Sequence, residues 1–212
     1  MTSVCTLSQI LRPGTSQRRR PGAAYRRVPR NPRLPEVTHR RYRRDVAHPL
    51  PAVGSVSVGV TATPEALWPL VSDPSVPARF STELEEAAFL EGSGAEVGAV
   101  IEGRNVNGGF EWTTHSTVVV CDPPRCFAWA TGGAEAPAAT WTFLVEDAVG
   151  GATLTHSVVL HEGQQPLASA IEAEPDRAAA IVQDRLAVLL ASMERTVSGI
   201  AGLAESAEAA DG

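Results

Sequence analysis

The chain has 212 residues, room for one domain with extensions, and its formal net charge of −6 conceals an uneven distribution. Residues 1–50 hold twelve arginines and two acidic residues, whereas residues 51–212 hold six arginines and 22 acidic residues. Three cysteines are too few for a disulfide scaffold, and no run of about 18 apolar residues exists to cross a membrane. We therefore predict an acidic domain with a basic extension and without a membrane span.

The extension, residues 1–50, is rich in arginine and proline and has little apolar periodicity. Such a segment buries too little apolar surface to offset the entropy of ordering it, so we predict that it is disordered. Its arginine clusters, at 18–20 and 40–44, could neutralise phosphates, but charge runs alone are weak evidence and a nucleic-acid partner is not expected. The extension also lacks the apolar segment of an export signal, which makes the cytoplasm the expected location.

Regular structure is expected from about residue 53. Val56, Val58 and Val60 alternate with small residues, which is the period-two pattern of a strand. Thr63 then provides an N-cap for a short helix that ends before Pro74. A second short helical segment is expected over residues 77–81.

The centre of the chain predicts six further strands, separated mostly by short turns, so that neighbouring strands should be antiparallel. A long helix is expected to begin at Pro175, because apolar residues recur three or four apart from Val182 to Leu203. A helix this one-sided must lie on the sheet, which favours a sheet curled around it. Residues 204–212 are expected to fray. The expected strands are 84–90, 97–106, 110–121, 127–131, 140–146 and 153–161.

Several short motifs follow one another in a characteristic order. They are Val58-x-Val60-x-Ala62 before Pro64-Glu65-x-x-Trp68, Gly98 to Arg104-Asn105, Trp112, Pro123-x-Arg125-x-Phe127-Ala128-Trp129, Trp141, and Gly150-Gly151-x-Thr153. In this order they resemble the START/Bet v 1-like superfamily, also called SRPBCC, and within it bacterial members labelled polyketide cyclase/dehydrase. The similarity covers about residues 53–203, which is the predicted extent of the domain.

The resemblance implies an α+β helix-grip fold. In this fold a curved antiparallel sheet of about seven strands surrounds a long C-terminal helix, with two short helices after the first strand. A cavity between sheet and helix takes up sterols, lipids, polyketides or other apolar molecules, and only some members are enzymes. A small apolar ligand is therefore the expected partner.

Alternation along the strands indicates which side chains could line such a cavity. Large rings mixed with small polar groups on one strand face suit a ligand site, although any single tryptophan could equally fill the core. The predicted ligand-binding set is Trp112, Thr114, Ser116, Trp129, Trp141, Phe143, His156, Leu186, Leu189 and Met193.

His156 and Arg104 are the catalytic candidates. His156 lies in an apolar row of its strand and should be buried and uncharged, either as a hydrogen-bonded core residue or as an acid or base. Arg104, if it faces inward, could bind a carboxylate or enolate oxygen; otherwise it would pair with Glu102 or Glu111.

Cys121 and Cys126 flank a short turn and could lie opposite each other. In a reducing cytoplasm two buried thiols are expected rather than a disulfide. The chain has no zinc-ligand spacing, nucleophile elbow, phosphate loop or dinucleotide motif. We therefore expect no metal and no cofactor.

Two functions are compatible with these features. The first is a protein similar to polyketide cyclases and dehydrases, in which His156 or Arg104 would assist enolisation. The second is a module without catalysis: a carrier of a lipid or quinone, or a protein that binds a protein partner. Turnover that is lost when His156 is replaced would favour the first, and ligand affinity without turnover would favour the second.

Overall fold

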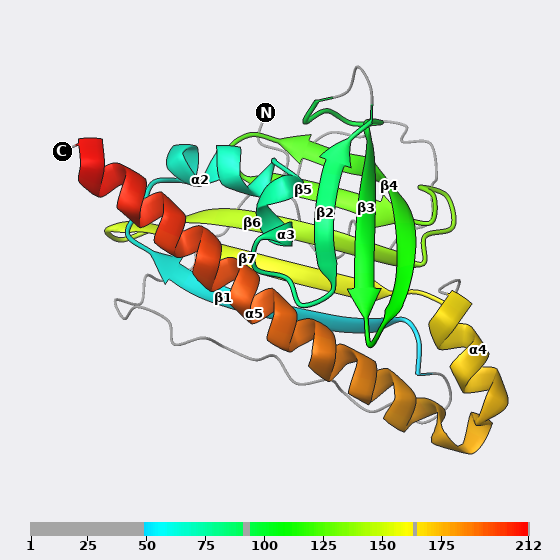
Figure 1. The fold of residues 1–212 in the computed structure, drawn as a ribbon. Helices are drawn as coiled ribbons and strands as arrows, with labels where there is room; N and C mark the ends of the chain where they lie inside the picture. The colour runs from blue at the N-terminus through cyan, green and yellow to red at the C-terminus, as the bar shows by residue number, and fades with distance from the viewer. Residues whose placement is uncertain (1–48, 91–93, 163–164, 212) are drawn as a thin grey trace, which may run out of the picture.

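Seven strands form one antiparallel sheet in the computed structural model, which describes residues 49–90, 94–162 and 165–211 (Figure 1). The sheet order is β1-β7-β6-β5-β4-β3-β2, so strands β2 to β7 follow the sequence and β1 pairs with the last strand. Each strand lies within a few residues of its predicted range. The predicted disorder of residues 1–50 falls almost entirely outside the described residues. The strands are β1 (Ala52–Val60), β2 (Leu84–Phe89), β3 (Val100–Asn107), β4 (Phe110–Asp122), β5 (Cys126–Thr131), β6 (Ala139–Ala148) and β7 (Gly151–Leu160).

Glycines in the left-handed region close two of the hairpins. Gly108 and Gly109 join β3 to β4 with φ values of 58° and 83°, and Gly150, with a φ of 83°, precedes β7. At Gly151 the φ is 152°, and a Cβ atom would overlap the carbonyl oxygen of Val60 at the end of β1. Glycine is required there both for its backbone freedom and for the close approach of two chain segments.

Two short helices follow β1, as predicted. Thr63 caps α2 (Pro64–Val71) by accepting a hydrogen bond from the amide of Ala66 at 3.2 Å. The second helix, α3 (Ser75–Ala78), begins two residues before the predicted segment. Both helices contact the C-terminal helix, so the connection from β1 to β2 closes one end of the fold.

The C-terminal helix α5 (Ala178–Asp211) crosses the side of the sheet toward which β2, β3 and β4 curl (Figure 1). By length and composition the segment Pro175–Ala210 could also cross a membrane. In this structure, however, its apolar stripe is buried in the core of the domain, which is the usual position of such a helix in a soluble fold. The buried stripe consists of Val182, Leu186, Leu189, Met193, Val197, Ile200 and Ala204.

Three details of this region differ from the predictions. Pro175–Arg177 is a 3-10 turn that precedes α5, and an additional helix, α4 (Gln165–Ala173), comes before it. Residues 204–211, predicted to fray, are helical. Glu205 and Glu208 anchor this end, because their carboxylates accept hydrogen bonds at 3.0 Å from the amides of Thr61 and Thr63.

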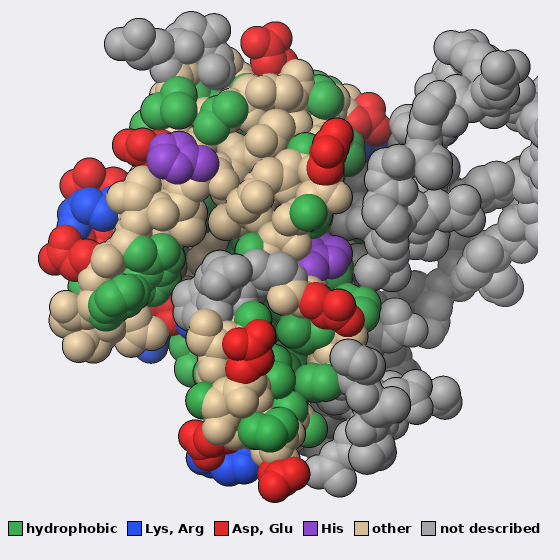
Figure 2. Space-filling model, turned by 90° about the vertical axis from the view of Figure 1, so that its right-hand side faces the viewer, with side chains coloured by type: hydrophobic (Ala, Val, Ile, Leu, Met, Phe, Trp, Pro, Cys, Tyr) green, Lys and Arg blue, Asp and Glu red, His purple; other side chains and the backbone are tan. Residues whose placement is uncertain are grey.

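The sheet is bent by two irregularities in its pairing. One lies between Leu84 and Glu86 of β2, and the other between Val118 and Val120 of β4. Extra residues of this kind increase local bending and twist, which lets the sheet close around α5. On the face in Figure 2 acidic side chains outnumber basic ones, in keeping with the excess of acidic residues over arginines in residues 51–212.

Candidate functional site

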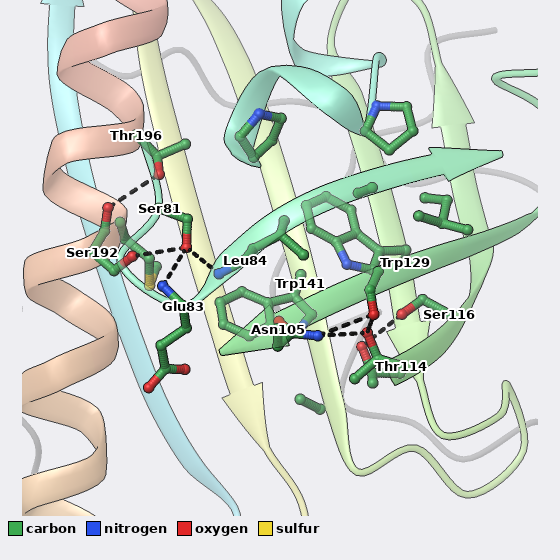
Figure 3. Close-up of a pocket in the computed structure, with 18 of the residues that line it drawn as sticks. Ser81, Glu83, Leu84, Asn105, Thr114, Ser116, Trp129, Trp141, Ser192 and Thr196 are labelled. Carbon is green, nitrogen blue, oxygen red and sulfur yellow. Dashed lines mark hydrogen bonds between the residues drawn. The ribbon is translucent and has the colours of Figure 1, made fainter. Parts of the chain in front are cut away.

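A cavity of about 170 Å³ lies between the inner face of the sheet and α5. Strands β2 to β7 all contribute to its wall, and α5 supplies the opposite side. Figure 3 shows the two groups of residues facing each other. The aromatic part of the wall consists of Trp112, Phe127, Trp129, Trp141 and Phe143, and His156 lies among them.

The strand register explains why these rings meet. Phe127, Phe143 and His156 lie directly opposite one another on β5, β6 and β7. Trp129 and Trp141 form the next row on the same face, two residues further along β5 and two back along β6. Because side chains two apart on a strand share a face, both rows project toward α5.

The rings form a cage around the imidazole of His156. Its nearest neighbour is Phe143, with centroids 4.2 Å apart and ring planes at 25°. Trp141 and Trp129 follow at 5.7 and 6.1 Å, and these two indoles stack on each other at 6.4 Å with an angle of 12°. Such packing buries large apolar areas and leaves flat ring surfaces on the wall.

His156 itself is a buried polar group without a partner. The residue is 5% exposed, and neither ring nitrogen makes a hydrogen bond in the described part of the chain. Burial lowers the pKa of His156 from its usual 6.5 to about 3, so the ring is neutral at physiological pH. A neutral imidazole offers one N–H donor and one nitrogen acceptor. Its predicted burial is confirmed, and no described residue supplies the hydrogen bond that a core histidine would be expected to make.

The polar side chains on β3, β4 and β5, by contrast, bond within the wall. The amide nitrogen of Asn105 donates to the hydroxyl of Thr114 at 3.3 Å and to a backbone carbonyl at 3.1 Å. The hydroxyls of Ser116 and Thr131 lie 2.8 Å apart. These groups therefore already have partners before any ligand arrives (Figure 3).

A second set of hydrogen bonds joins α5 to the segment before β2. The hydroxyl of Ser192 accepts a hydrogen bond from the amide of Thr82 at 3.1 Å and lies 3.3 Å from the hydroxyl of Ser81. Ser81 in turn accepts from the amides of Glu83 and Leu84 at 3.1 and 2.9 Å (Figure 3). These bonds fix the start of β2 against the helix.

An ion pair between Glu83 and Arg185 completes this side of the cavity. The guanidinium donates to both carboxylate oxygens, at 2.5 and 2.8 Å, and Asn107 donates to the same carboxylate at 2.7 Å. The Glu83 side chain is only 10% exposed. The sequence analysis did not identify Arg185 as a residue of the cavity wall. Its spacing of four from Leu189 was the available signal, because residues four apart share a helix face.

All the predicted ligand-binding residues except Leu186 line the cavity. That they bind a ligand stays a prediction. Leu186 is buried, but it packs over Gly54 of β1, where the absence of a side chain leaves room for it. It therefore lies off the cavity wall, although it belongs to the same stripe as Leu189.

Arg104 does not line the cavity, so the inward orientation considered for it is wrong. Its neighbours Gly103 and Asn105 do line the cavity, and the alternation of a strand turns Arg104 outward. There it pairs with Glu85 at 2.7 Å and with Glu86 at 3.3 Å. A catalytic role for Arg104 within the cavity has no structural basis.

Outside the cavity, Glu102 and the cysteines also differ from expectation. Glu102, considered as a partner for Arg104, instead lies 2.9 Å from a ring nitrogen of His115 on the outer face. Cys121 is a free thiol, whereas Cys126 is disulfide-bonded, so the prediction of two thiols is wrong for Cys126. Across the described ranges, no three His, Cys, Asp or Glu side chains are placed to hold a metal ion.

A curved antiparallel sheet wrapped around a C-terminal helix, with an aromatic cavity between them, defines a helix-grip protein. The family described as polyketide cyclase/dehydrase and lipid transport matches residues 52–198, and the chain belongs to this family. The match confirms the resemblance to SRPBCC proteins and to their polyketide cyclase/dehydrase branch.

Solved structures show the same fold. A polyketide-cyclase-like protein of Corynebacterium glutamicum is 25% identical, with a TM-score of 0.54 over 72% of this chain and 91% of that one. Two di-domain ARO/CYC proteins are also similar: BexL from the BE-7585A biosynthetic pathway (19% identity, TM-score 0.54) and StfQ from the steffimycin biosynthetic pathway (13%, 0.59). This chain covers 50% and 51% of their lengths, using 72% and 74% of its own. Among curated proteins, none matches the sequence.

Proposed function

We propose that this protein binds a small, largely apolar molecule in the cavity between the sheet and α5. The observation that carries the proposal is His156, which lies on the cavity wall with both ring nitrogens unpaired among the described residues. A buried polar group without a partner is unfavourable, and such groups in native proteins usually have an explanation. A ligand that enters the cavity would supply the partner.

The walls and the volume indicate the kind of ligand. Flat indole and phenyl surfaces favour a ring-containing molecule, because aromatic groups stack well on them. The volume of about 170 Å³ is comparable to the ~150 Å³ apolar cavity that takes up benzene in another protein. A molecule of one or two fused rings therefore fits without rearrangement of the wall.

Catalysis of the polyketide cyclase/dehydrase kind is the second candidate, favoured by the family. In that case the cavity would hold a reactive chain in a folded shape, and His156 would stabilise an enol by hydrogen bonding. A pKa of about 3 makes His156 a poor base at neutral pH. The geometry therefore supports binding, as in a carrier, better than proton transfer. A protein that binds only protein partners would not require this cavity.

The proposal is tested by filling the cavity from α5. 1-Naphthylamine, a fluorescent probe of two fused rings that is uncharged at neutral pH, should bind the full chain with micromolar affinity. Leu189→Trp places extra atoms in the cavity and should weaken binding at least tenfold. Val188→Trp is the matched control, because Val188 is 45% exposed on the same helix and its replacement should leave affinity unchanged. Equal binding by both variants, with folding verified by circular dichroism, would overturn the proposed site.

A further inference from the structure

We propose that His156 selects the ligand: the cavity takes uncharged ring compounds that present a hydrogen-bond donor, such as a phenol or enol hydroxyl, to its imidazole. The inference rests on the proposed function and adds to it the chemical class of the ligand. It also assigns to one residue the task of distinguishing a hydroxylated ring from a plain hydrocarbon ring.

No group in the described part of the chain satisfies His156. Its nitrogens lie in the plane of the ring, so stacking on Phe143 leaves both of them unpaired. The residues opposite it on the neighbouring strands are Phe143 and Val56, which carry no polar side-chain atoms. Among the described residues, His156 is the only side chain with buried, unpartnered nitrogen or oxygen atoms. Because His156 is part of the cavity wall, a molecule bound in the cavity is the partner that we infer for it.

The amide and hydroxyl side chains that the sheet contributes to the wall already have hydrogen-bond partners. Asn105 and Thr114 bond to each other, as do Ser116 and Thr131. Replacing these bonds with bonds to a ligand would bring little net gain, because one partner is exchanged for another. At His156 a ligand gains a bond without breaking one inside the protein, so a ligand that can bond to the imidazole is favoured over one that cannot.

Charge narrows the class of ligand further. Among the described residues of the wall, the one cationic side chain is Arg185, and both oxygens of Glu83 hold it. An anionic ligand would lose its hydration in the aromatic cage without gaining an unpaired cation, which is strongly unfavourable. The site should therefore discriminate against carboxylates and accept neutral hydroxyl groups.

The experiment compares naphthalene, 2-naphthol and 2-naphthoate, which share one ring system and differ in the polar group. Binding to the full chain is followed by quenching of tryptophan fluorescence at neutral pH. We expect 2-naphthol to bind roughly three- to tenfold more tightly than naphthalene, the advantage of one hydrogen bond. We expect 2-naphthoate to bind at least tenfold more weakly than 2-naphthol.

The variant His156→Phe keeps a ring in the cage and removes the nitrogens. It should fold, because it eliminates a buried unsatisfied group. The preference for 2-naphthol over naphthalene should disappear in this variant, while naphthalene still binds. His115→Phe is the matched control, because His115 pairs with Glu102 on the outer face and does not line the cavity, so the preference should persist.

A direct measurement needs no variant. The nitrogen chemical shifts of His156 in the ¹⁵N-labelled protein should move on adding 2-naphthol and stay in place on adding naphthalene. If naphthalene binds but 2-naphthol has no advantage, or if the advantage survives in His156→Phe, the selection by His156 is wrong and the binding function stands. If neither compound nor the fluorescent probe binds, the binding function itself is wrong.

Discussion

The imidazole of His156 lies nearly parallel to the phenyl ring of Phe143, with centroids 4.2 Å apart, and both side chains belong to one row across β6 and β7. This pair combines an apolar contact with a buried, neutral base that has no partner in the described part of the chain. Both side chains lie on the cavity wall, where we propose that the ligand contacts His156. The consequences can be measured in stability as well as in binding.

The first prediction concerns pH. The pKa of His156 is lowered to about 3 by burial, whereas in the unfolded chain it returns to about 6.5. Between these values the unfolded state binds the extra proton, so stability falls as the pH decreases, by up to about 1.4 kcal/mol per pH unit from this group. Above pH 6.5 the group has no such effect.

The measurement is urea unfolding of the wild type and His156→Phe at pH 7.0, 5.5 and 4.5. Relative to His156→Phe, the wild type should lose about 2 to 3 kcal/mol of unfolding free energy between pH 7.0 and pH 4.5. His161, whose pKa is also lowered by burial, is present in both proteins and cancels in the difference. A constant difference across the range would show that His156 is solvated.

The second prediction concerns the pair Glu83 and Arg185. Removing one member leaves an uncompensated charge in a largely buried position, so Arg185→Met should destabilise the protein by about 3 kcal/mol. The double variant with Glu83→Gln should recover part of the loss, and thermal or urea unfolding measures both. Arg104→Met is the control: that ion pair is exposed and should contribute less than about 1 kcal/mol. If Arg185→Met and Arg104→Met lowered the unfolding free energy by similar amounts, the Glu83–Arg185 pair would not behave as a buried ion pair.

The third prediction compares two glycines of α5. A Cβ atom at Gly199 would overlap the ring of Phe80, whereas nothing lies within 4 Å of a Cβ at Gly202. Gly202→Ala should therefore stabilise the protein by about 0.5 to 1 kcal/mol through helix propensity. Gly199→Ala should destabilise it by about 1 to 2 kcal/mol, because Phe80 must leave its packing position. Chemical unfolding of the two variants decides, and equal effects would refute the close packing of Phe80.

The fourth prediction separates a carrier from an enzyme. His156→Gln keeps hydrogen-bonding capacity at the site but cannot act as a proton-transferring base. If His156 only positions a ligand, the variant retains binding, and any conversion of a poly-β-ketone substrate changes by less than about tenfold. A general base would lose on the order of a hundredfold or more in turnover with affinity unchanged. We expect the smaller effect, because an imidazole with a pKa of about 3 is a weak base at neutral pH.

Sequence periodicity alone predicted much of the fold and of the cavity wall. Alternation along a strand determines which residues share a face, so the pattern of β4 correctly groups Trp112, Thr114 and Ser116. The hairpin glycines and the Thr63 cap act within a few residues, and local interactions of this kind are readable in sequence. The long apolar stripe likewise required a sheet to cover it.

The tertiary structure decided what depends on contacts between distant segments. Alternation groups residues but does not say which group faces inward, and the curvature of the sheet placed Asn105 inside and Arg104 outside. The position of α5 over β1 directed Leu186 toward Gly54 and Leu189 into the cavity, although both belong to one stripe. On the cavity wall Arg185 pairs with Glu83, which lies 102 residues away in the sequence, and no local pattern predicts that pair. The unpartnered state of His156 depends on every side chain packed around it, and no local pattern in the sequence carries that information.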